Sequence, residues 1–227
     1  MNQTLAPLII GFGHKARQGK GTVVQTIIDY AKDKYDIRSY GFGDELKKEV
    51  NQVDQFEACM KAGLKYDFTP PMDDPLCPTK HGKQSVLLQW WGAMRRKQDP
   101  FYWVKKVATQ ITKDQPRVVL IHDVRYKNEF AFISSLNGFL VKVSRHGFID
   151  LTRDPRHISE TDLENTVFPF EINVLDGELD QLKKDAVTCF DMIVDFVTPK
   201  PDDPNDLSEP VTELIEVEPS KLIVEAA

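Results

Sequence analysis

The feature that most constrains the fold is a short apolar run followed by a basic, glycine-containing loop and then a helix. The run Pro7–Phe12 predicts a buried strand, and residues 19–34 have apolar side chains at helical spacing. The loop between them lies in Gly11–Thr22, with the sequence GFGHKARQGKGT. A loop in this position points backbone N–H groups into one concavity and aims a helix N-terminus at it. The unit is therefore suited to binding phosphate groups.

Strand and helix patterns alternate along the rest of the chain. Apolar runs predict further strands at Arg38–Phe42, Arg117–His122, Phe139–Val143 and Glu171–Leu175. Helical patterns cover Asp44–Gln55, Ser85–Lys97, Pro100–Thr112, Lys127–Leu136 and Glu178–Phe196, and a capping pattern at Ser159–Asp162 predicts a short helix. Prolines at 66–82 indicate a loop or excursion. We predict an α/β fold: a P-loop NTPase-like parallel sheet with helices on both faces, plus a helical substrate-binding or lid excursion.

Charge is distributed unevenly along the 227 residues. Lys and Arg number 29 against 35 Asp and Glu, a net charge of −6. Residues 198–227 contain two lysines and eight acidic residues, so they account for the whole excess, and residues 1–197 are neutral. A neutral body excludes a protein that binds nucleic acid through a strongly basic surface. With five prolines besides, residues 198–227 are predicted to be an acidic tail, disordered or loosely docked on the domain at 1–197.

Cysteine spacing and hydropathy indicate the compartment. Cys59, Cys77 and Cys189 lie far apart without a CxxC pair, which argues against a disulfide framework or zinc ribbon and fits a reducing cytosol. No stretch approaches 18 apolar residues, and Met1–Pro7 lacks a basic leader region. We expect a cytoplasmic protein that neither binds a membrane nor binds nucleic acid stably.

The residues of the loop suggest individual roles. Lys20 supplies a charge for β- and γ-phosphate oxygens, and Thr22 a hydroxyl near a metal-bound phosphate. His14 stands where the Walker A motif has its first glycine, with Gly13 adjacent, and Gly21 follows the lysine to give the GKGT ending familiar from adenylate kinases. We expect the Lys20 side chain to be exposed when no nucleotide is bound. The alternative is a basic turn without a ligand.

A second motif, Asp123–Glu129, follows the strand RVVLIH. Ligands of open α/β sheets bind beyond the carboxyl ends of strands, so Asp123 and Arg125 should face the same crevice as the loop. Asp123 could hold Mg²⁺ directly or through water, and Arg125 offers a planar fork for phosphate. In the alternative, Asp123 caps the next helix and Arg125 forms a surface ion pair with Glu129.

Two further basic segments are candidates for phosphate contacts. Within Leu88–Trp103, positive charge lies beside aromatic rings, an arrangement that can grip a phosphate monoester while a ring supports a base; the alternative is a core of Trp90, Trp91 and Trp103 under the solvated face of Arg95, Arg96 and Lys97. The connection Ser144–Arg156 has arginines that could close as a lid over a phosphoryl group, namely Arg145, Arg153 and Arg156. The alternative there is a solvated loop with Ser159 as an N-cap and His157 at the surface.

In their order, these motifs resemble those of phage-type deoxynucleoside monophosphate kinases, P-loop proteins with an adenylate-kinase-like fold. The resemblance covers roughly Leu8–Phe196 and rests on GxxHKARQGKGT, FGDELKK, LLQWWGAMRRKQDPFYWVKK, VVLIHDVRYKNE, HISETDLE and NVLDGELDQLKKD. It implies phosphorylation of dNMPs to dNDPs by ATP with Mg²⁺, in the host-cell cytoplasm if the gene belongs to a phage. The sequence departs from the family's common GKARSGKDT at His14, Gln18 and Gly21, and has Ala93 where a threonine is common.

Motifs and resemblance together give the candidate site. Catalytic roles fall to Lys20, Arg95, Asp123 and Arg125. ATP would bind Gly13, Lys15, Gly19, Lys20, Gly21, Thr22 and Arg153, with Thr22 and Asp123 at the metal. The monophosphate would bind Asp44, Lys47, Gln89, Gly92, Arg95, Arg96, Trp103, Arg125 and Glu129.

Three matters of function and assembly stay open. Another P-loop small-molecule kinase, such as a phosphomevalonate kinase, is one alternative function. A nucleotide-binding regulator without turnover is another. The chain is compatible with a monomer or a homodimer, and the apolar patches Leu214–Val217 and Leu222–Val224 of the tail could dock on a partner.

Overall fold

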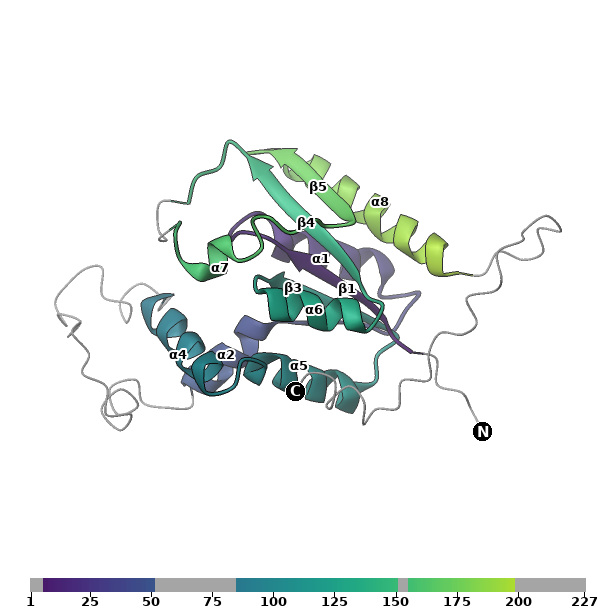
Figure 1. Cartoon of the computed structure of the whole chain (residues 1–227). Coiled ribbons are helices and arrows are strands. Elements are labelled where there is room, and N and C mark those ends of the chain that lie inside the picture. The colour runs from purple at the N-terminus through teal and green to yellow at the C-terminus, as the bar shows by residue number, and fades with distance from the viewer. Residues whose placement is uncertain (1–5, 52–84, 151–154, 199–227) are drawn as a thin grey trace, which may run out of the picture.

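Strands and helices alternate along the chain, as Figure 1 shows. The computed structural model describes residues 6–51, 85–150 and 155–198. The strands are β1 (Leu8–Gly13), β2 (Ile37–Tyr40), β3 (Val118–Val124), β4 (Phe139–His146) and β5 (Phe170–Leu175). The helices are α1 (Lys20–Ala31), α2 (Phe42–Asn51), α4 (Ser85–Gln98), α5 (Tyr102–Asp114), α6 (Lys127–Ser135), α7 (Ile158–Thr161) and α8 (Leu179–Val197).

The five strands form one sheet in the order β2-β3-β1-β4-β5, and every neighbouring pair is parallel. This confirms the predicted α/β class. In the register of β1 with β3, Gly13 lies opposite Val124. The loop that follows β1 and the motif at the end of β3 therefore meet at the same carboxyl edge.

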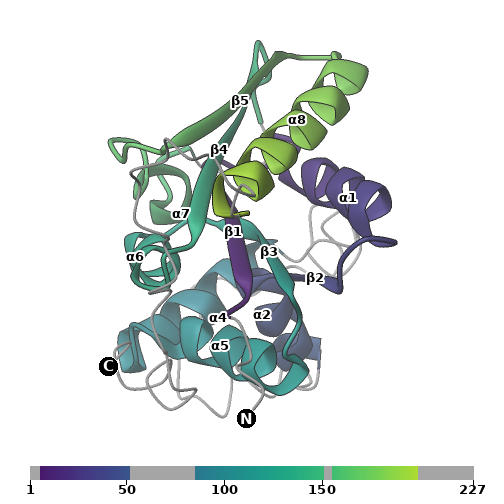
Figure 2. The same cartoon turned by 90° about the vertical axis from the view of Figure 1, so that its right-hand side faces the viewer.

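Side chains of the central strand β1 alternate between two buried clusters. Ile10 and Phe12 pack with the apolar faces of α1 and α8, whereas Ile9 packs with α5 and α6 on the opposite face. Figure 2 shows α1 and α8 on one side of the sheet and α6 on the other. Burial on both faces explains why β1 and β3 are nearly continuous apolar runs, as is usual for parallel sheets.

Some predicted boundaries are wrong, for local reasons. The predicted second strand stops at Tyr40, and Phe42 already opens α2, so Asp44 lies in the first helical turn instead of capping it. β4 continues to His146 because it pairs with β5 along its length. The short helix is capped by His157, whose Nδ1 accepts the N–H of Ser159, so Ser159 is not the N-cap.

Several predictions lie outside the described residues. They concern the excursion at 66–82, Cys59 and Cys77, Arg153, and the tail beyond Thr198. The predicted lid stays a prediction for the same reason. Among the helices that are described, none combines the length and the apolar character needed to span a bilayer.

Candidate functional site

The loop between β1 and α1 has an unusual backbone. His14, Arg17 and Gly19 have φ values of 90°, 55° and 98°, in the left-handed region that L-amino acids with side chains adopt at a cost. A Cβ atom on Gly19 would lie 2.8 Å from Cδ2 of Leu182, so glycine is required there by both conformation and space. His14 adopts the same backbone region at the position where the Walker A motif has glycine. The loop thus keeps its turns despite that substitution.

Lys20 lies inside this loop. Its residue is 5% exposed, and its Nζ donates hydrogen bonds to the carbonyl oxygen of His14, at 3.1 Å, and to that of Lys15. The expectation of an exposed side chain is wrong, because the curled loop presents two carbonyl groups to the ammonium. The ammonium is therefore held inside the loop when no phosphate is bound.

Four consecutive loop residues contact the end of β4 and the segment that follows it. One contact is buried: the backbone N–H of Ala16 donates to Oε2 of Glu160 at 2.8 Å. The other three are Lys15 with Glu164 at 3.2 Å, Arg17 with Asp150 at 3.3 Å, and the Gln18 side-chain oxygen with the N–H of Arg145. The loop is thereby fixed to elements more than 120 residues away in the sequence.

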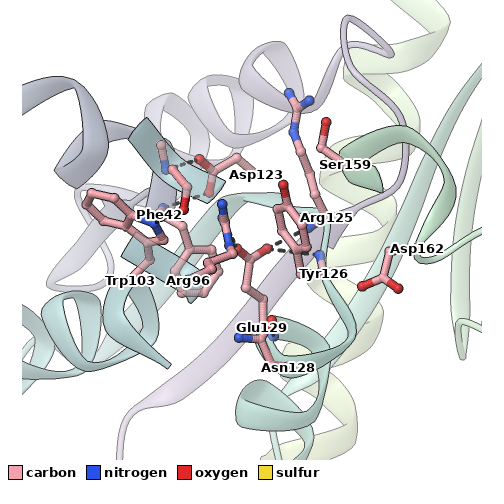
Figure 3. Close-up of polar contacts among 12 residues, drawn as sticks. Phe42, Arg96, Trp103, Asp123, Arg125, Tyr126, Asn128, Glu129, Ser159 and Asp162 are labelled. Carbon is pink, nitrogen blue, oxygen red and sulfur yellow. Dashed lines mark hydrogen bonds and ion pairs between the residues drawn. The ribbon is translucent and has the colours of Figure 1, made fainter. Parts of the chain in front are cut away.

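Asp123 caps a helix, though not the predicted one. Its two carboxylate oxygens accept the N–H groups of Phe42, at 2.9 Å, and Gly43, at 2.7 Å, at the start of α2 (Figure 3). The alternative in which it caps α6 is wrong. A carboxylate offers about four lone-pair positions, so Asp123 retains acceptor capacity for a metal-bound water.

Arg125 points toward the loop. Its Nη1 donates to Oε1 of Glu160 at 2.9 Å, and Figure 3 shows its side chain extending away from Glu129 toward the segment of Ser159. The predicted surface pair of Arg125 with Glu129 is therefore wrong for the side chains. The two residues are joined through the backbone instead, since the N–H of Arg125 donates to Oε2 of Glu129 at 2.8 Å.

Glu129 is buried, with 1% exposure. Its carboxylate also accepts the N–H of Tyr126 at 3.1 Å and Nη2 of Arg96 at 3.1 Å, and the Arg96 guanidinium lies 3.7 Å from the Tyr126 ring centroid. Burial raises the pKa of Glu129 to about 7, although Arg96 and the backbone N–H groups oppose that rise. These contacts fix the turn that directs Arg125.

Arg95 faces a different carboxylate from Arg96. Its Nε donates to Oε1 of Glu49 at 2.6 Å, and its guanidinium lies 5.3 Å from the Trp91 ring and 5.0 Å from the Tyr102 ring. Glu49 also accepts the Tyr102 hydroxyl at 2.8 Å and pairs with Lys106 at 3.3 Å. Burial acts to raise the pKa of Glu49, but the hydrogen bonds outweigh it and the pKa is lowered. The α4 arginines are thus directed by two separate glutamates.

The other predicted monophosphate residues lie on α2, α4 and α5. Trp103 is 1% exposed, and its Nε1 donates to the carbonyl of Gly92 at 3.3 Å. For this indole the alternative interpretation, a core residue, is confirmed. Gln89 is half-buried, and Lys47 is exposed and pairs with Asp44 at 2.7 Å. Their substrate contacts stay predictions.

Sequence reasoning missed His122, Glu49 and Glu160. Nε2 of His122 lies 2.8 Å from Oδ2 of Asp44, and this hydrogen bond raises the pKa of His122 and lowers that of Asp44. The three residues share no motif with their partners. Only their positions just before Asp123, within α2 and within HISETDLE could have drawn attention to them.

The remaining predicted phosphate contacts occupy both sides of the loop. Gly13 ends β1 against Phe168, and Gly21 and Thr22 lie in the first turn of α1, where a Cβ on Gly21 would meet nothing within 4 Å. Burial and the nearby Lys142, Lys15 and Lys20 lower the pKa of His14 to about 4, so its imidazole is neutral. The predicted lid arginines lie in and after β4. Arg145 pairs with Asp176 at 3.3 Å, and Arg156 is exposed.

The site lacks a preformed metal cage. Across the described residues, no three His, Cys, Asp or Glu side chains are grouped to hold a metal ion. The prediction of Mg²⁺ does not require such a group, because Mg²⁺ is usually bound through substrate phosphates, water and one or two carboxylates. Asp123 and the Thr22 hydroxyl are the predicted protein contributors.

Comparison with known proteins gives one distant relative. No protein-family model matches the chain. A protein of Acanthamoeba polyphaga mimivirus named "Putative deoxynucleotide monophosphate kinase" is 24% identical over 198 residues, spanning 76% of this chain and 93% of the viral protein. The similarity therefore extends over most of both chains and is not confined to the loop between β1 and α1.

Proposed function

We propose that this protein is an ATP-dependent kinase that phosphorylates deoxynucleoside monophosphates to diphosphates. The observation that carries the proposal is the loop of residues 14–19 at the end of β1, which turns through positive φ and holds Lys20 against its carbonyls, with Arg125 at the adjacent end of β3. The name of the mimivirus relative, a deoxynucleotide monophosphate kinase, supports the same class of reaction.

The donor nucleotide would bind at the loop. Backbone N–H groups at the start of α1 and the Lys20 ammonium are the donors that triphosphate oxygens require. Mg²⁺, when bound, would neutralise charge shared between the phosphates. Thr22 supplies a hydroxyl and Asp123 a carboxylate that is already oriented by the amides of α2.

The acceptor nucleotide would bind toward α4. Arg95 and Arg96 provide guanidinium groups for its phosphate, and each is already aligned by a carboxylate and an aromatic ring. Their planar forks match phosphate geometry better than an ammonium does. The half-buried Tyr102 ring beside Arg95 offers a surface on which a base could stack.

Phosphoryl transfer needs little covalent chemistry from this chain. The acceptor phosphate is already an anion, so no general base is required, and the rate would come from in-line positioning and charge stabilisation. Lys20 and Arg125 would stabilise the charge on the transferred group. Both lie at the carboxyl edge of the sheet, Lys20 at the start of α1 and Arg125 directly after β3.

A panel of acceptors tests the proposal. Purified protein, ATP and Mg²⁺ are incubated with each of the four dNMPs, the NMPs and phosphomevalonate, and ADP and phosphorylated products are measured. We expect dNDP formation with at least one dNMP and none with phosphomevalonate, and Lys20→Ala serves as the inactive control. Product from phosphomevalonate alone, or tight ATP binding without turnover of any acceptor, would overturn the proposal.

A further inference from the structure

Glu160 is a buried carboxylate beside the loop of residues 14–19, here called the phosphate loop, and the function proposed above gives it no role. It lies in α7, is 8% exposed, and reaches both the loop and the end of β3. One carboxylate oxygen accepts the Ala16 N–H at 2.8 Å, and the other accepts Arg125 Nη1 at 2.9 Å and the Ser159 hydroxyl at 3.3 Å. A single carboxylate therefore joins three segments that are distant in the sequence.

We infer that Glu160 is a positioning residue, which holds the phosphate loop and directs Arg125 toward the transferred phosphoryl group. This inference rests on the proposed kinase function and adds a residue to it. Arginine has a long side chain with several rotatable bonds, so an unpaired guanidinium would spend little time in one orientation. A buried, charge-assisted bond to a fixed carboxylate restricts that freedom.

The loop gains from the same carboxylate. Lys15, Arg17 and Gln18 are attached through side chains, and the Lys15 and Arg17 ion pairs involve partly exposed side chains. Exposed pairs contribute little to rigidity in water. Ala16 is attached through its backbone to a buried group, so Glu160 is a contact from outside the loop that fixes the main chain itself.

A competing role for Glu160 predicts the opposite change in nucleotide affinity. A carboxylate on a loop N–H and an arginine resembles a phosphate, and Glu160 could act as an internal competitor of ATP. In that case its removal would tighten nucleotide binding. A positioning residue leaves the loop and Arg125 misplaced when it is removed, so its loss weakens binding and slows transfer.

The test compares Glu160→Gln with a matched control, Glu171→Gln. The control removes the same charge from an exposed pair between Glu171 on β5 and Lys142 on β4. For Glu160→Gln we expect kcat to fall roughly 10- to 100-fold, the range for losing a hydrogen bond to a charged group. The Kd for a non-hydrolysable ATP analogue should rise about three- to tenfold at a temperature where the variant is folded. The control should match the wild-type protein.

A double-mutant cycle with Arg125→Lys separates positioning from simple stability. If Glu160 acts through Arg125, the double variant should be no more than about threefold slower than the slower single variant. Fully additive losses in kcat, tighter binding of the analogue, or a lowered Tm with unchanged kcat and Kd would each overturn the inference. Should Glu160→Gln not fold, Glu160→Asp keeps the charge but is too short for both contacts, and the same expectations apply.

Failure of the proposed function gives a different result. If the wild-type protein phosphorylates no acceptor, the kinase proposal is wrong. The change in analogue affinity then still decides whether Glu160 positions the loop, because that measurement needs no turnover.

Discussion

The loop between β1 and α1 and the arginine pair of α4, the two regions that we propose bind phosphate groups, hold their cations in different ways. The loop uses the main chain: three residues with positive φ turn its backbone, and Lys20 lies against its carbonyls. On α4, Arg95 and Arg96 depend on the side chains of Glu49 and Glu129 for their orientation. The comparison teaches that the turns of the loop depend on its main chain, which adopts positive φ even with His14 in place of glycine, whereas the α4 arginines depend on single carboxylates.

Lys20→Ala should have the largest effect and tests the loop directly. The ammonium supplies charge in the transition state that alanine cannot, so we expect kcat to fall at least about 100-fold. Steady-state kinetics with ATP and the best dNMP measure it. Lys183→Ala, an exposed lysine on α8, is the control. A kcat near the wild-type value would remove the loop from the mechanism.

The pH dependence of stability tests the buried carboxylate behind Arg96. The pKa of Glu129 is raised to about 7 in the folded protein from an ordinary value of 4.5, so its contribution to stability is complete below pH 4.5 and is lost as the pH rises through 7. The raised pKa of His122 acts in the same direction at higher pH. Glu129 alone should lower the free energy of unfolding by up to about 3 kcal/mol between pH 4.5 and 8. The lowered pKa of His14 acts in the opposite direction between about pH 4 and 6.5, so the effect of Glu129 is measured as a difference from a variant that lacks its carboxyl group.

Glu129→Gln supplies the control for this pH effect. The amide does not titrate, whereas His14 and His122 titrate in both proteins. The difference between the two free energies of unfolding, measured by urea denaturation, should therefore change by up to about 3 kcal/mol between pH 4.5 and 8. Equal slopes in the variant and the wild-type protein would mean that Glu129 is ionised throughout, held by Arg96.

Two glycines of the loop should differ in their tolerance of alanine. Gly19→Ala places a Cβ at positive φ and 2.8 Å from Leu182, and should destabilise the fold by about 1–3 kcal/mol. Gly21→Ala meets nothing within 4 Å in the first turn of α1, so it should be neutral or stabilising by about 1 kcal/mol. Thermal unfolding measures both. Equal effects would show that the backbone does not determine the loop's shape.

Glu49→Gln should have a smaller, selective effect. Without its charged partner Arg95 becomes mobile, and we expect KM for the dNMP to rise about tenfold while KM for ATP stays unchanged. Glu45→Gln, which loses an ion pair with Lys48 on the same helix, is the matched control. An equal rise in both KM values would place Arg95 outside the acceptor site.

The sheet could be predicted from the sequence because the patterns that indicate strands and helices involve neighbouring residues. Buried runs such as RVVLIH and the helical spacing after Gly19 identify parallel strands and their covering helices, and the carboxyl edge of such a sheet is the place for Lys20, Asp123 and Arg125. The residues next to a charged side chain do not indicate which distant residue it will contact in the folded protein. Asp123 caps a helix 80 residues earlier, and Glu160 binds a loop 144 residues earlier.

The burial of Lys20 was missed for a related reason. A lysine after a glycine-containing loop is expected to extend toward its ligand, but the positive φ values of His14 and Arg17 turn the loop so that carbonyls of His14 and Lys15 face the ammonium. Such dihedral angles are unusual for these residue types, so the sequence predicts the loop's position better than its shape.

Amide hydrogen exchange with each nucleotide tests the central claim, that the loop binds the donor and α4 the acceptor. With Mg²⁺ and a non-hydrolysable ATP analogue, exchange should slow over residues 14–22 and stay unchanged over residues 91–98. Addition of a dNMP should then slow exchange over residues 91–98 and 125–129. If the ATP analogue leaves residues 14–22 unprotected, or protects α4 instead, the account of this site is contradicted.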